Sequence, residues 1–223
     1  MQFSIIIPTL NESGSLAFAL KDLLASIEYL SQVEIIVADG GSEDGCIEQA
    51  RGFPVQVMSS PRGRALQMNS GAERAMGDWL LFLHADTRLP GDWMQRLQAC
   101  EGDWGRFDVR LSGSHWLFRI IERAMNLRSC RTGIATGDQA MFFRREFFQA
   151  LGGFPDIPLM EDIAISKRAR DSSMPVCIQQ PVITSSRRWE RKGILRTVLL
   201  MWLLRLAYWV GTNPKTLHRW YYG

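Results

Sequence analysis

The sequence has few cysteines, and their positions exclude the common cysteine-based sites. Four cysteines are spread over 223 residues, at Cys46, Cys100, Cys130 and Cys177, and no two of them form a C-x-x-C motif. Zinc ribbons and dithiol redox sites need closely spaced pairs of that kind. A chain of this length can be stable without a disulfide framework, so we expect four reduced thiols in a cytoplasmic protein.

The sequence also lacks a recognisable targeting segment, internal repeats, low-complexity stretches and long linkers. Its N-terminus has no basic region ahead of the first apolar run, and that run ends at Pro8. This pattern is typical of a first strand rather than of a signal peptide. Hydrophobic residues make up 46% and charged residues 22%, which is ordinary globular usage. We therefore expect one compact unit with a sizeable core.

Negative charge is almost missing from the C-terminal segment. Residues 187–223 contain eight Lys or Arg and one acid, Glu190, which gives +7; since the whole chain carries +3, the rest carries −4. An acidic body with a basic tail suggests an anionic partner near the C-terminus: a phosphate, a lipid headgroup or another subunit. No RNA- or DNA-binding motif accompanies the basic residues, so we do not expect nucleic acid as a partner.

Strand and helix patterns alternate through the first half of the chain. Short β-branched runs predict strands buried on both faces, and apolar residues spaced by three and four predict the helices between them. The expected strands are 3–7, 33–38, 55–58 and 79–83, and the expected helices are 15–30, a short one after Ser42, and 65–76. This order predicts an α/β fold with a Rossmann-like, mostly parallel sheet and helices on both faces.

The second half of the chain is less regular. Strands are expected at 104–111 and 140–144, helices at 116–127 and from about 161 to 170, and a helical tail over 193–222. We therefore divide the chain into one α/β domain, residues 1–190, and a basic, apolar C-terminal helical extension, residues 191–223.

Polar residues follow each of the first four expected strands. Because ligands of such sheets bind beyond the carboxyl ends of the strands, we expect these segments to meet at one site. The segments are Pro8-Thr9-Leu10-Asn11-Glu12, Asp39-Gly40-Gly41-Ser42-Glu43-Asp44-Gly45, Pro61-Arg62-Gly63-Arg64 and His84-Ala85-Asp86-Thr87.

These segments and two later motifs, Glu161-Asp162 and Arg187-Arg188-Trp189, resemble glycosyltransferase family 2 in their order and spacing. The resemblance covers residues 2–190. It implies an inverting enzyme of the GT-A fold that uses a nucleotide-sugar donor and a divalent metal. Within the family, the chain is most similar to the compact bacterial subset named radical-SAM/selenodomain-associated or arsenosugar biosynthesis glycosyltransferases.

The resemblance implies donor contacts in several segments. Pro8, Glu12 and Asp39 would surround the nucleoside, with Asp39 accepting the imino proton of the base in a charge-assisted hydrogen bond. Arg64 would contact the phosphates from a helix N-terminus, where Gly63 lets the backbone approach a ligand. Turn residues and a solvated charged loop would explain the same pattern. The full expected donor set is Pro8, Thr9, Asn11, Glu12, Asp39, Arg62, Gly63, Arg64, His84, Ala85, Asp86, Arg188 and Trp189.

Asp86 matches the second acid of the family's Asp-x-Asp motif. The resemblance implies that it holds Mn²⁺ or Mg²⁺ against the donor diphosphate. The first acid of that motif is His84 here, and this departure leaves two alternatives: His84 contacts the donor, or it points into the core. An imidazole ligand would favour Mn²⁺ or a softer ion over Mg²⁺.

Glu161 and Asp162 resemble the family's acidic pair ahead of the acceptor site. Inversion requires an acceptor hydroxyl to attack the anomeric carbon while a base takes its proton, and adjacent carboxylates raise each other's proton affinity. The resemblance implies Asp162 as the base with Glu161 in support, although acids at a helix start also act as caps. Asp138 and Gln139 precede an expected strand and could meet the acceptor, but a turn explains them equally well.

Arg188 and Trp189 resemble the family's arginine–tryptophan element. In the family this element closes over the diphosphate or lines the acceptor channel. The Gln that usually stands three residues before the arginine is Ser185 here, which argues against a processive polysaccharide synthase.

The apolar tail segment 194–210 is too short and too charged to be expected across a membrane. Its 17 residues would form a helix of about 26 Å, against ~30 Å of hydrocarbon. Arg196 and Arg205 are nine residues apart and point to opposite sides; two central arginines would cost roughly 5–7 kcal/mol on an insertion scale. We expect this helix to hold a homodimer together, with peripheral contact to the inner membrane face, or packing on the body, as alternatives.

The sequence therefore predicts an inverting, metal-dependent glycosyltransferase that moves a sugar from a nucleotide sugar, a UDP-sugar by family habit, to an acceptor hydroxyl. A sugar nucleotidyltransferase is one alternative, but a Gly-rich basic loop should then follow the first strand, where Glu12 stands instead. A non-catalytic nucleotide-binding scaffold is the other. The sequence leaves the sugar, the nucleotide base and the acceptor open.

Overall fold

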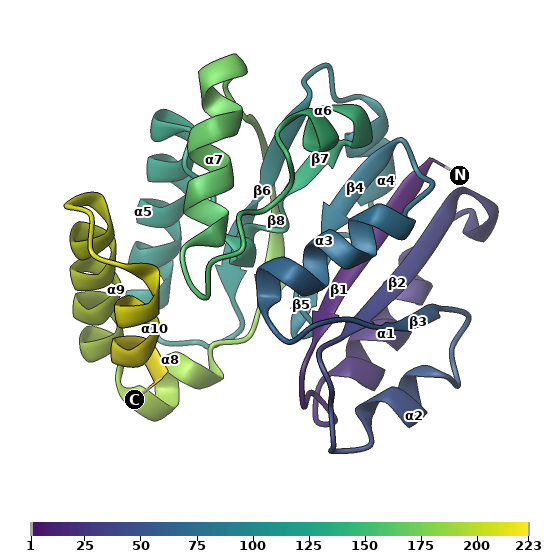
Figure 1. Ribbon diagram of the computed structural model, residues 1–223, viewed down its shortest axis with the longest axis horizontal. Coiled ribbons are helices and arrows are strands. Elements are labelled where there is room, and N and C mark those ends of the chain that lie inside the picture. The colour runs from purple at the N-terminus through teal and green to yellow at the C-terminus, as the bar shows by residue number, and fades with distance from the viewer. Residues whose placement is uncertain (1, 223) are drawn as a thin grey trace.

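One eight-stranded mixed sheet runs through the middle of the protein in the computed structural model, which describes residues 2–222 (Figure 1). The strand order is β3-β2-β1-β4-β7-β6-β8-β5. The strands are β1 (Phe3–Thr9), β2 (Val33–Asp39), β3 (Gln56–Ser59), β4 (Trp79–Phe82), β5 (Thr87–Arg88), β6 (Trp104–Leu111), β7 (Phe142–Arg144) and β8 (Val176–Thr184).

Helices cover both faces of this sheet and extend beyond it at the C-terminal end. Two short 3-10 turns, η1 (Leu30–Gln32) and η2 (Gly137–Gln139), connect elements. The α-helices are α1 (Leu16–Ala25), α2 (Cys46–Ala50), α3 (Arg64–Arg74), α4 (Trp93–Gln98), α5 (Trp116–Thr132), α6 (Arg145–Ala150), α7 (Glu161–Ser172), α8 (Arg187–Lys192), α9 (Ile194–Trp209) and α10 (Pro214–Tyr222).

The first four strands form the parallel part of the sheet, and β1 lies at its centre. β1 pairs in parallel with β2 and β4, and β2 pairs in parallel with β3. Phe3, Ile5 and Ile7 pack with residues of α1, α2 and α4, whereas Ile6 packs with residues of α3, α6 and α7. Because both faces are covered, the strand has to be apolar at successive positions. The predicted α/β sheet with helices on both faces is confirmed.

The second half of the sheet departs from the expected parallel pattern. β7 is antiparallel to both of its neighbours, β4 and β6, while β6 and β8 are parallel. β8 was not predicted, because the polar pair Gln179-Gln180 and Pro181 interrupt its apolar pattern. The register between β6 and β8 shifts at Phe107 and Asp108, which absorbs this pair. The helix expected over 15–30 ends at Ala25.

The last two helices, α9 and α10, pack against the start of α7 (Figure 1). Their contact with the body is a separate cluster of buried residues from α9, α10, α7 and the residue before α7: Met160, Ile163, Leu204, Ala207 and Leu217. The expected boundary at residue 190 falls inside α8, and the division into a domain and an extension stays a prediction. Within residues 2–222, none of the helices combines the length and the apolar character that crossing a bilayer requires.

The expectation of four reduced thiols is wrong for two of them. Cys130 at the end of α5 and Cys177 in β8 are joined by a disulfide, with their Cα atoms 5.9 Å apart, while Cys46 and Cys100 are free and buried. The two cysteines are 47 residues apart in sequence, and the pairing depends on β8 lying beside β6 under α5. Spacing alone could not show it, because the sequence pattern had missed β8.

Candidate functional site

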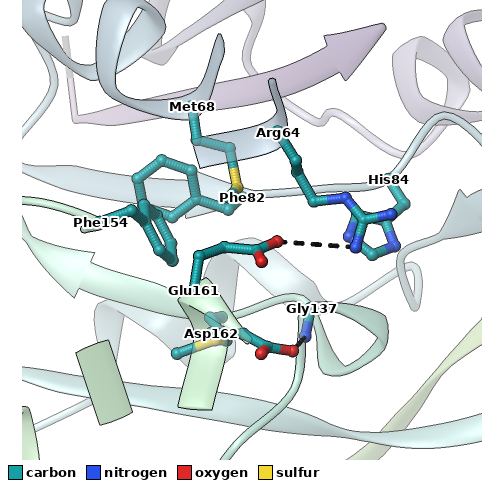
Figure 2. A pocket seen from close by; sticks show the side chains of 9 residues that line it. Arg64, Met68, Phe82, His84, Gly137, Phe154, Glu161 and Asp162 are labelled. Carbon is teal, nitrogen blue, oxygen red and sulfur yellow. Dashed lines mark hydrogen bonds and ion pairs between the residues drawn. The ribbon is translucent and has the colours of Figure 1, made fainter. Parts of the chain in front are cut away.

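The candidate site lies where α3, η2 and α7 meet beyond the end of β4. A small cavity of about 10 Å³ lies between these elements, which is room for about one water molecule. Figure 2 shows Arg64 from α3 pointing across it toward Glu161 at the start of α7. The cavity is lined by Arg64, Met68, Phe82, His84, Gly137, Met141, Phe154, Glu161 and Asp162.

Glu161 and Asp162 form the acidic centre of this site. The Glu161 side chain is only 4% exposed, and Asp162 accepts hydrogen bonds from the backbone N–H of Gly137 at 3.0 Å and of Ile163 at 2.7 Å. Burial raises the pKa of both carboxyls, because a charged carboxylate loses hydration there. In the case of Glu161, the charge of Asp162 adds to this rise. A buried carboxyl of raised proton affinity is suited to accept a proton from a hydroxyl.

Arg64 supplies the positive charge opposite the acidic pair. Its Nη1 lies 3.7 Å from Glu161 Oε1, and its side chain is 43% exposed. Burial disfavours the charged guanidinium, but the nearby Glu161 carboxylate outweighs it and raises the pKa of Arg64 above its usual value. Gly63 precedes the helix with a φ of 143°, a conformation that a side chain would strain. The structure therefore places Arg64 with the predicted catalytic pair, at the first position of α3.

His84 faces an acid of the acceptor set instead of the protein core. Its Nδ1 lies 3.4 Å from Asp138 Oδ1, and its Nε2 is buried without a hydrogen-bond partner in the described structure. Burial alone would raise the pKa of Asp138, but the hydrogen bond and charge of His84, with Arg64 and Arg188 nearby, lower it. A Cβ at Gly137 would come within 2.6 Å of His84 Nε2. Gly137 therefore lets η2 approach His84 closely.

The C-terminal helix brings two tyrosines to this site that sequence reasoning missed. The Arg188 guanidinium lies 3.5 Å from the ring centre of Tyr221 and donates a hydrogen bond to the Tyr221 carbonyl at 3.2 Å. Burial raises the pKa of Tyr221 to about 12. Tyr221 and Tyr222 are close enough to Arg64 for their charges to affect its pKa. The sequence showed only an aromatic, basic tail, so nothing in it linked residue 221 to residues 64 and 188.

The loops after β1 and β2 form the second part of the candidate site. The backbone N–H of Asn11 donates to Ser42 Oγ at 2.9 Å, and Asn11 Oδ1 accepts from the Glu43 backbone at 2.9 Å. Asp39 accepts hydrogen bonds from the Gly41 and Ser42 backbone and from the Ser42 hydroxyl at 2.6 Å. Ser42 thus stabilises the turn after β2 instead of capping a helix, and α2 begins only at Cys46.

Some predicted donor and acceptor residues are buried, and their contacts within the protein are structural. Thr9 is buried and its hydroxyl donates to the Ile7 carbonyl at 3.3 Å; Ala85 is buried as well. Gln139 is buried and forms a capping box with Thr136 at the start of η2. Sequence reasoning gave no role to Gln67, whose buried Nε2 donates to the carbonyls of Thr9 and Ala38, holding the ends of β1 and β2 together. The roles predicted for Thr9, Ala85 and Gln139 remain predictions.

The remaining predicted residues are half-buried or exposed. Pro8, Trp189 and Glu12 are half-buried, Arg62 is exposed in the loop before α3, and Glu12 accepts a hydrogen bond from the Ser15 hydroxyl at 2.6 Å. Arg128 on α5 is a further charge that sequence reasoning missed. Burial lowers the pKa of Arg128, and the Asp162 charge opposes that shift.

Asp86 is the one acid on the β4 loop that fits a metal ligand. Its carboxylate is half-buried, and the hydrogen bond recorded for it comes from the neighbouring Thr87 hydroxyl at 3.5 Å. The described residues contain no group of three His, Cys, Asp or Glu side chains that could enclose an ion. Mg²⁺ and similar ions at nucleotide sites often take one protein carboxylate, with phosphates and water completing the shell. The single carboxylate of Asp86 therefore fits a metal whose other ligands come mainly from the substrate phosphates and water.

Backbone strain concentrates in the loops of the candidate site. In residues 2–222 three non-glycine residues have positive φ: Asn11 at 55°, Ala140 at 45° and Met160 at 71°. Asn11 belongs to the loop after β1, Ala140 follows η2, and Met160 directly precedes Glu161. Each such residue costs on the order of 1–3 kcal/mol and is held by its surroundings. The strain falls on the segments that carry the predicted donor and acidic residues.

Replacing Glu161 with glutamine should make stability less sensitive to pH. The folded pKa of Glu161 is raised, so the stability it contributes is fully present below its unfolded pKa and is lost as pH rises through its folded pKa. Glu161→Gln removes this loss, about 1.4 kcal/mol for each unit between the two pKa values. In thermal melts, the Tm of the variant relative to that of wild type should increase from acid to neutral pH. The exposed Glu73→Gln is the control; an equal gain there would contradict the assignment.

Comparison with known proteins places the chain in a recognised family. A family model described as glycosyl transferase family 2 matches residues 4–151. The chain is 29% identical over 169 residues to a PGL/p-HBAD biosynthesis glycosyltransferase of Mycobacterium bovis, an alignment that covers 68% of this chain and 62% of that protein. The chain thus spans about three fifths of the length of that relative.

Solved structures share the fold at low sequence identity. TarS (residues 1–349) from S. aureus superposes with a TM-score of 0.66 at 17% identity, covering 83% of this chain and 61% of that one. A mannosyltransferase from Pyrobaculum calidifontis, solved with GDP-Man and Mn²⁺, gives a TM-score of 0.61 at 22% identity and covers 82% and 56% of the two chains. These similarities show that the chain has the fold of these glycosyltransferases.

Proposed function

The chain belongs to glycosyltransferase family 2, and from this we propose that it transfers a sugar, with inversion, from a nucleoside diphosphate sugar to an acceptor hydroxyl. The observation that carries the proposal is the acidic pair of buried Glu161 and half-buried Asp162, which faces Arg64 across a cavity at the carboxyl end of β4. The pair offers a proton acceptor and the arginine offers a phosphate ligand, the two functions that such a reaction requires.

The donor would lie with its nucleoside toward β1 and β2 and its diphosphate toward α3. Asn11, Glu12 and Asp39 present polar groups in the first of these regions. Arg64 stands at the N-terminus of α3, where the helix dipole also favours an anion. Because Arg64 pairs with Glu161 at 3.7 Å, a diphosphate at this position would compete with Glu161 for the guanidinium. Loss of that pairing would raise the proton affinity of the acidic pair further.

In the transfer step, Asp162 would remove the proton from the acceptor hydroxyl. The hydroxyl oxygen would form a bond to the anomeric carbon from the face opposite the leaving group. The bond from that carbon to the diphosphate oxygen would break, and the nucleoside diphosphate would leave with the electron pair. The backbone N–H of Gly137 and of Ile163 hold the Asp162 carboxylate in a fixed orientation. Asp138 and Arg128 are the charged groups near this acceptor side.

Asp86 would hold the divalent metal, Mn²⁺ or Mg²⁺, which would supply positive charge to the diphosphate as it leaves. The P. calidifontis mannosyltransferase contains Mn²⁺ with its donor, and TarS has been solved with UDP. Both support, for this chain, a nucleotide donor and a divalent metal. A UDP-sugar is our first choice of donor. The membership in the radical-SAM or arsenosugar subset and the cytoplasmic location are likewise proposals.

Tyr221→Ala should weaken donor binding through Arg188. The ring and the carbonyl of Tyr221 hold the guanidinium in place, and an arginine–aromatic contact is worth about 0.5–2 kcal/mol. If Arg188 closes over the diphosphate, calorimetry should show a loss in affinity of about twofold to thirtyfold. Tyr221→Phe should retain wild-type affinity, and the exposed Tyr29→Ala serves as the control. Unchanged binding in Tyr221→Ala would remove Arg188 from the donor site.

A thermal-shift screen of nucleotides and nucleotide sugars, with and without Mn²⁺, tests the proposal and identifies the donor. A ligand at one hundred times its dissociation constant stabilises the folded state by about 2.7 kcal/mol. We expect one nucleotide family to raise Tm, more strongly with Mn²⁺ than without. If no nucleotide or nucleotide sugar raises Tm under either condition, the proposed donor site is wrong.

A further inference from the structure

The outward side of α9 is an apolar surface that nothing in the described chain covers. Trp202 and Trp209 are 71% and 75% exposed, although tryptophan in a folded protein is usually covered in large part. A continuous exposed surface of several large apolar side chains marks an interaction site in a soluble protein. We call these residues the α9 face: Leu195, Leu199, Trp202, Leu203, Leu206, Trp209 and Val210.

The residues of the α9 face lie along one side of the helix. At about 100° per residue they fall within an arc of about 120°. The opposite side of the helix is packed on the body: Thr197, Leu204 and Ala207 are buried. Figure 1 shows α9 at the edge of the molecule farthest from β2 and β3, with α10 beside it.

Two arginines border the α9 face without interrupting it. Arg196 and Arg205 lie on opposite sides of the helix, as expected, but the arc between them on the solvent side carries only apolar residues. Two arginines on opposite sides therefore still leave the helix with one uniformly apolar side. Arg196 is exposed and Arg205 is half-buried, so both heads can reach a surface that meets the apolar face.

We propose that the α9 face docks on the surface of an anionic lipid bilayer. Charge complementarity supports this occupant, because the charges around the face are almost all positive. Besides the two bordering arginines, Arg191, Lys192 and Arg219 are exposed on α8 and α10. The one acid of residues 187–222 is Glu190, and it accepts a hydrogen bond from the Ser186 hydroxyl at 2.8 Å. Leucine and tryptophan on a helix with basic flanks is the pattern of helices that lie in a membrane interface.

A second copy of the chain fits the α9 face less well. In a two-fold contact the α9 face of one copy would meet the α9 face of the other. The arginines that border the two faces, Arg196 and Arg205 of each copy, would then come close together. The face contains no acid that could pair with them, and like charges at an interface are costly. Acids of the body could pair with these arginines in a two-fold dimer only if α9 of each copy packed on the body of the other, and the α9 faces would then not meet each other. The homodimer predicted from the sequence is therefore the alternative that the test must distinguish.

The helix would lie on the bilayer and not cross it. Its 16 residues span about 24 Å, and its inner side is already packed on the body. That inner side includes Leu204 and Ala207, which contact Met160 and Ile163 beside the acidic pair. Docking through the α9 face would thus hold Glu161 and Asp162 about one helix diameter, about 10 Å, from the headgroups.

Vesicle flotation with the full-length protein tests this proposal. The probes are phosphatidylcholine vesicles with and without phosphatidylglycerol. We expect flotation with the anionic vesicles, little with the neutral ones, and release at high salt. The double variant Trp202→Ser/Trp209→Ser should lose at least about tenfold in binding. Arg196→Gln and Arg205→Gln should each lose about fivefold.

Matched variants elsewhere on the surface serve as controls. Trp116 on α5 is 65% exposed, and Arg74 at the end of α3 is exposed as well. Trp116→Ser and Arg74→Gln should float like wild type, and melts should show that all variants are folded. Trp202 and Trp209 lie outside the cavity, so nucleotide binding without vesicles should be unchanged in their double variant. That readout separates failure of this proposal from failure of the proposed function.

Three results would overturn the proposal. The first is a full-length protein that does not bind anionic vesicles, and the second is a loss of binding in Trp116→Ser as large as in the double variant. The third is light scattering that shows a stable dimer in the absence of lipid, which the Trp202→Ser/Trp209→Ser variant converts to a monomer. In that case the occupant of the α9 face is a second copy of the chain.

Discussion

Replacing Asp162 with asparagine should abolish glycosyl transfer while leaving donor affinity nearly unchanged. Asparagine keeps the shape of the side chain and an oxygen that can accept from the Gly137 N–H, but it cannot take a proton from the acceptor. Loss of a general base typically costs about 10²–10⁴ in rate. Turnover number and donor affinity, measured separately by steady-state kinetics and calorimetry, should therefore separate in this variant.

Two outcomes for Asp162→Asn would change the assignment. A variant that keeps most of its turnover number would move the base to Glu161 or another acid. A variant that loses donor binding would place Asp162 in the nucleotide site. Asp171→Asn, an exposed acid near the end of the same helix, controls for a general effect of charge on α7. It should retain both turnover and affinity.

Asp86→Asn should remove the metal-dependent part of donor binding. The amide keeps the size of the carboxylate but lacks the charge that would hold the cation. Because changes even beside metal ligands cost about 10–100-fold in metal affinity, loss of the carboxylate should reduce UDP affinity in Mn²⁺ by at least about tenfold. The affinity measured without metal should stay the same. Calorimetric titrations of UDP with and without Mn²⁺ provide this comparison.

The control for Asp86→Asn is Asp78→Asn, an exposed acid directly before β4 at the opposite end of the strand. This variant should bind UDP in Mn²⁺ as the wild type does. If Asp86→Asn also binds UDP in Mn²⁺ with wild-type affinity, Asp86 does not hold a metal. Metal dependence would then have to come from the nucleotide alone.

The parallel half of the fold was predictable because its strands are buried on both faces. The run Phe3–Ile7 has to serve two helical layers, so all of its residues except Ser4 are apolar and it stands out in the sequence. The same logic located β2 and β4. Their polar ends could then be grouped, because the carboxyl ends of parallel strands meet at one edge. Arg64, His84 and Glu161 do come together there.

The second half was less predictable because its structure depends on long-range contacts. β8 includes a polar, proline-containing stretch that only the register shift against β6 accommodates. The Cys130–Cys177 disulfide depends on that strand. The contact of Tyr221 with Arg188 depends on how α10 folds back over α8 and α9. Local periodicity carries no information on any of these three arrangements.

The tail shows that a correct helix prediction does not reveal which side of the helix is exposed. The segment 194–210 was expected to be helical and α9 covers Ile194–Trp209. The positions of Arg196 and Arg205 on opposite sides do not by themselves show which side of the helix faces the body. Only the packing of Leu204 and Ala207 on α7 shows which side is inward. The apolar arc between the two arginines could then be recognised as exposed.

NMR analysis of the products formed from a nucleotide sugar in Mn²⁺, with water as a surrogate acceptor, tests directly whether the protein is an inverting glycosyltransferase. Inverting transfer predicts release of a nucleoside diphosphate, a first-formed sugar whose anomeric configuration is opposite to that of the donor, and no products from Asp162→Asn. A sugar 1-phosphate released with a nucleoside monophosphate, or with a nucleoside triphosphate when pyrophosphate is added, would instead indicate nucleotidyl chemistry. Tight nucleotide-sugar binding with no cleavage, in the presence or absence of candidate acceptors, would contradict the account and indicate a non-catalytic scaffold.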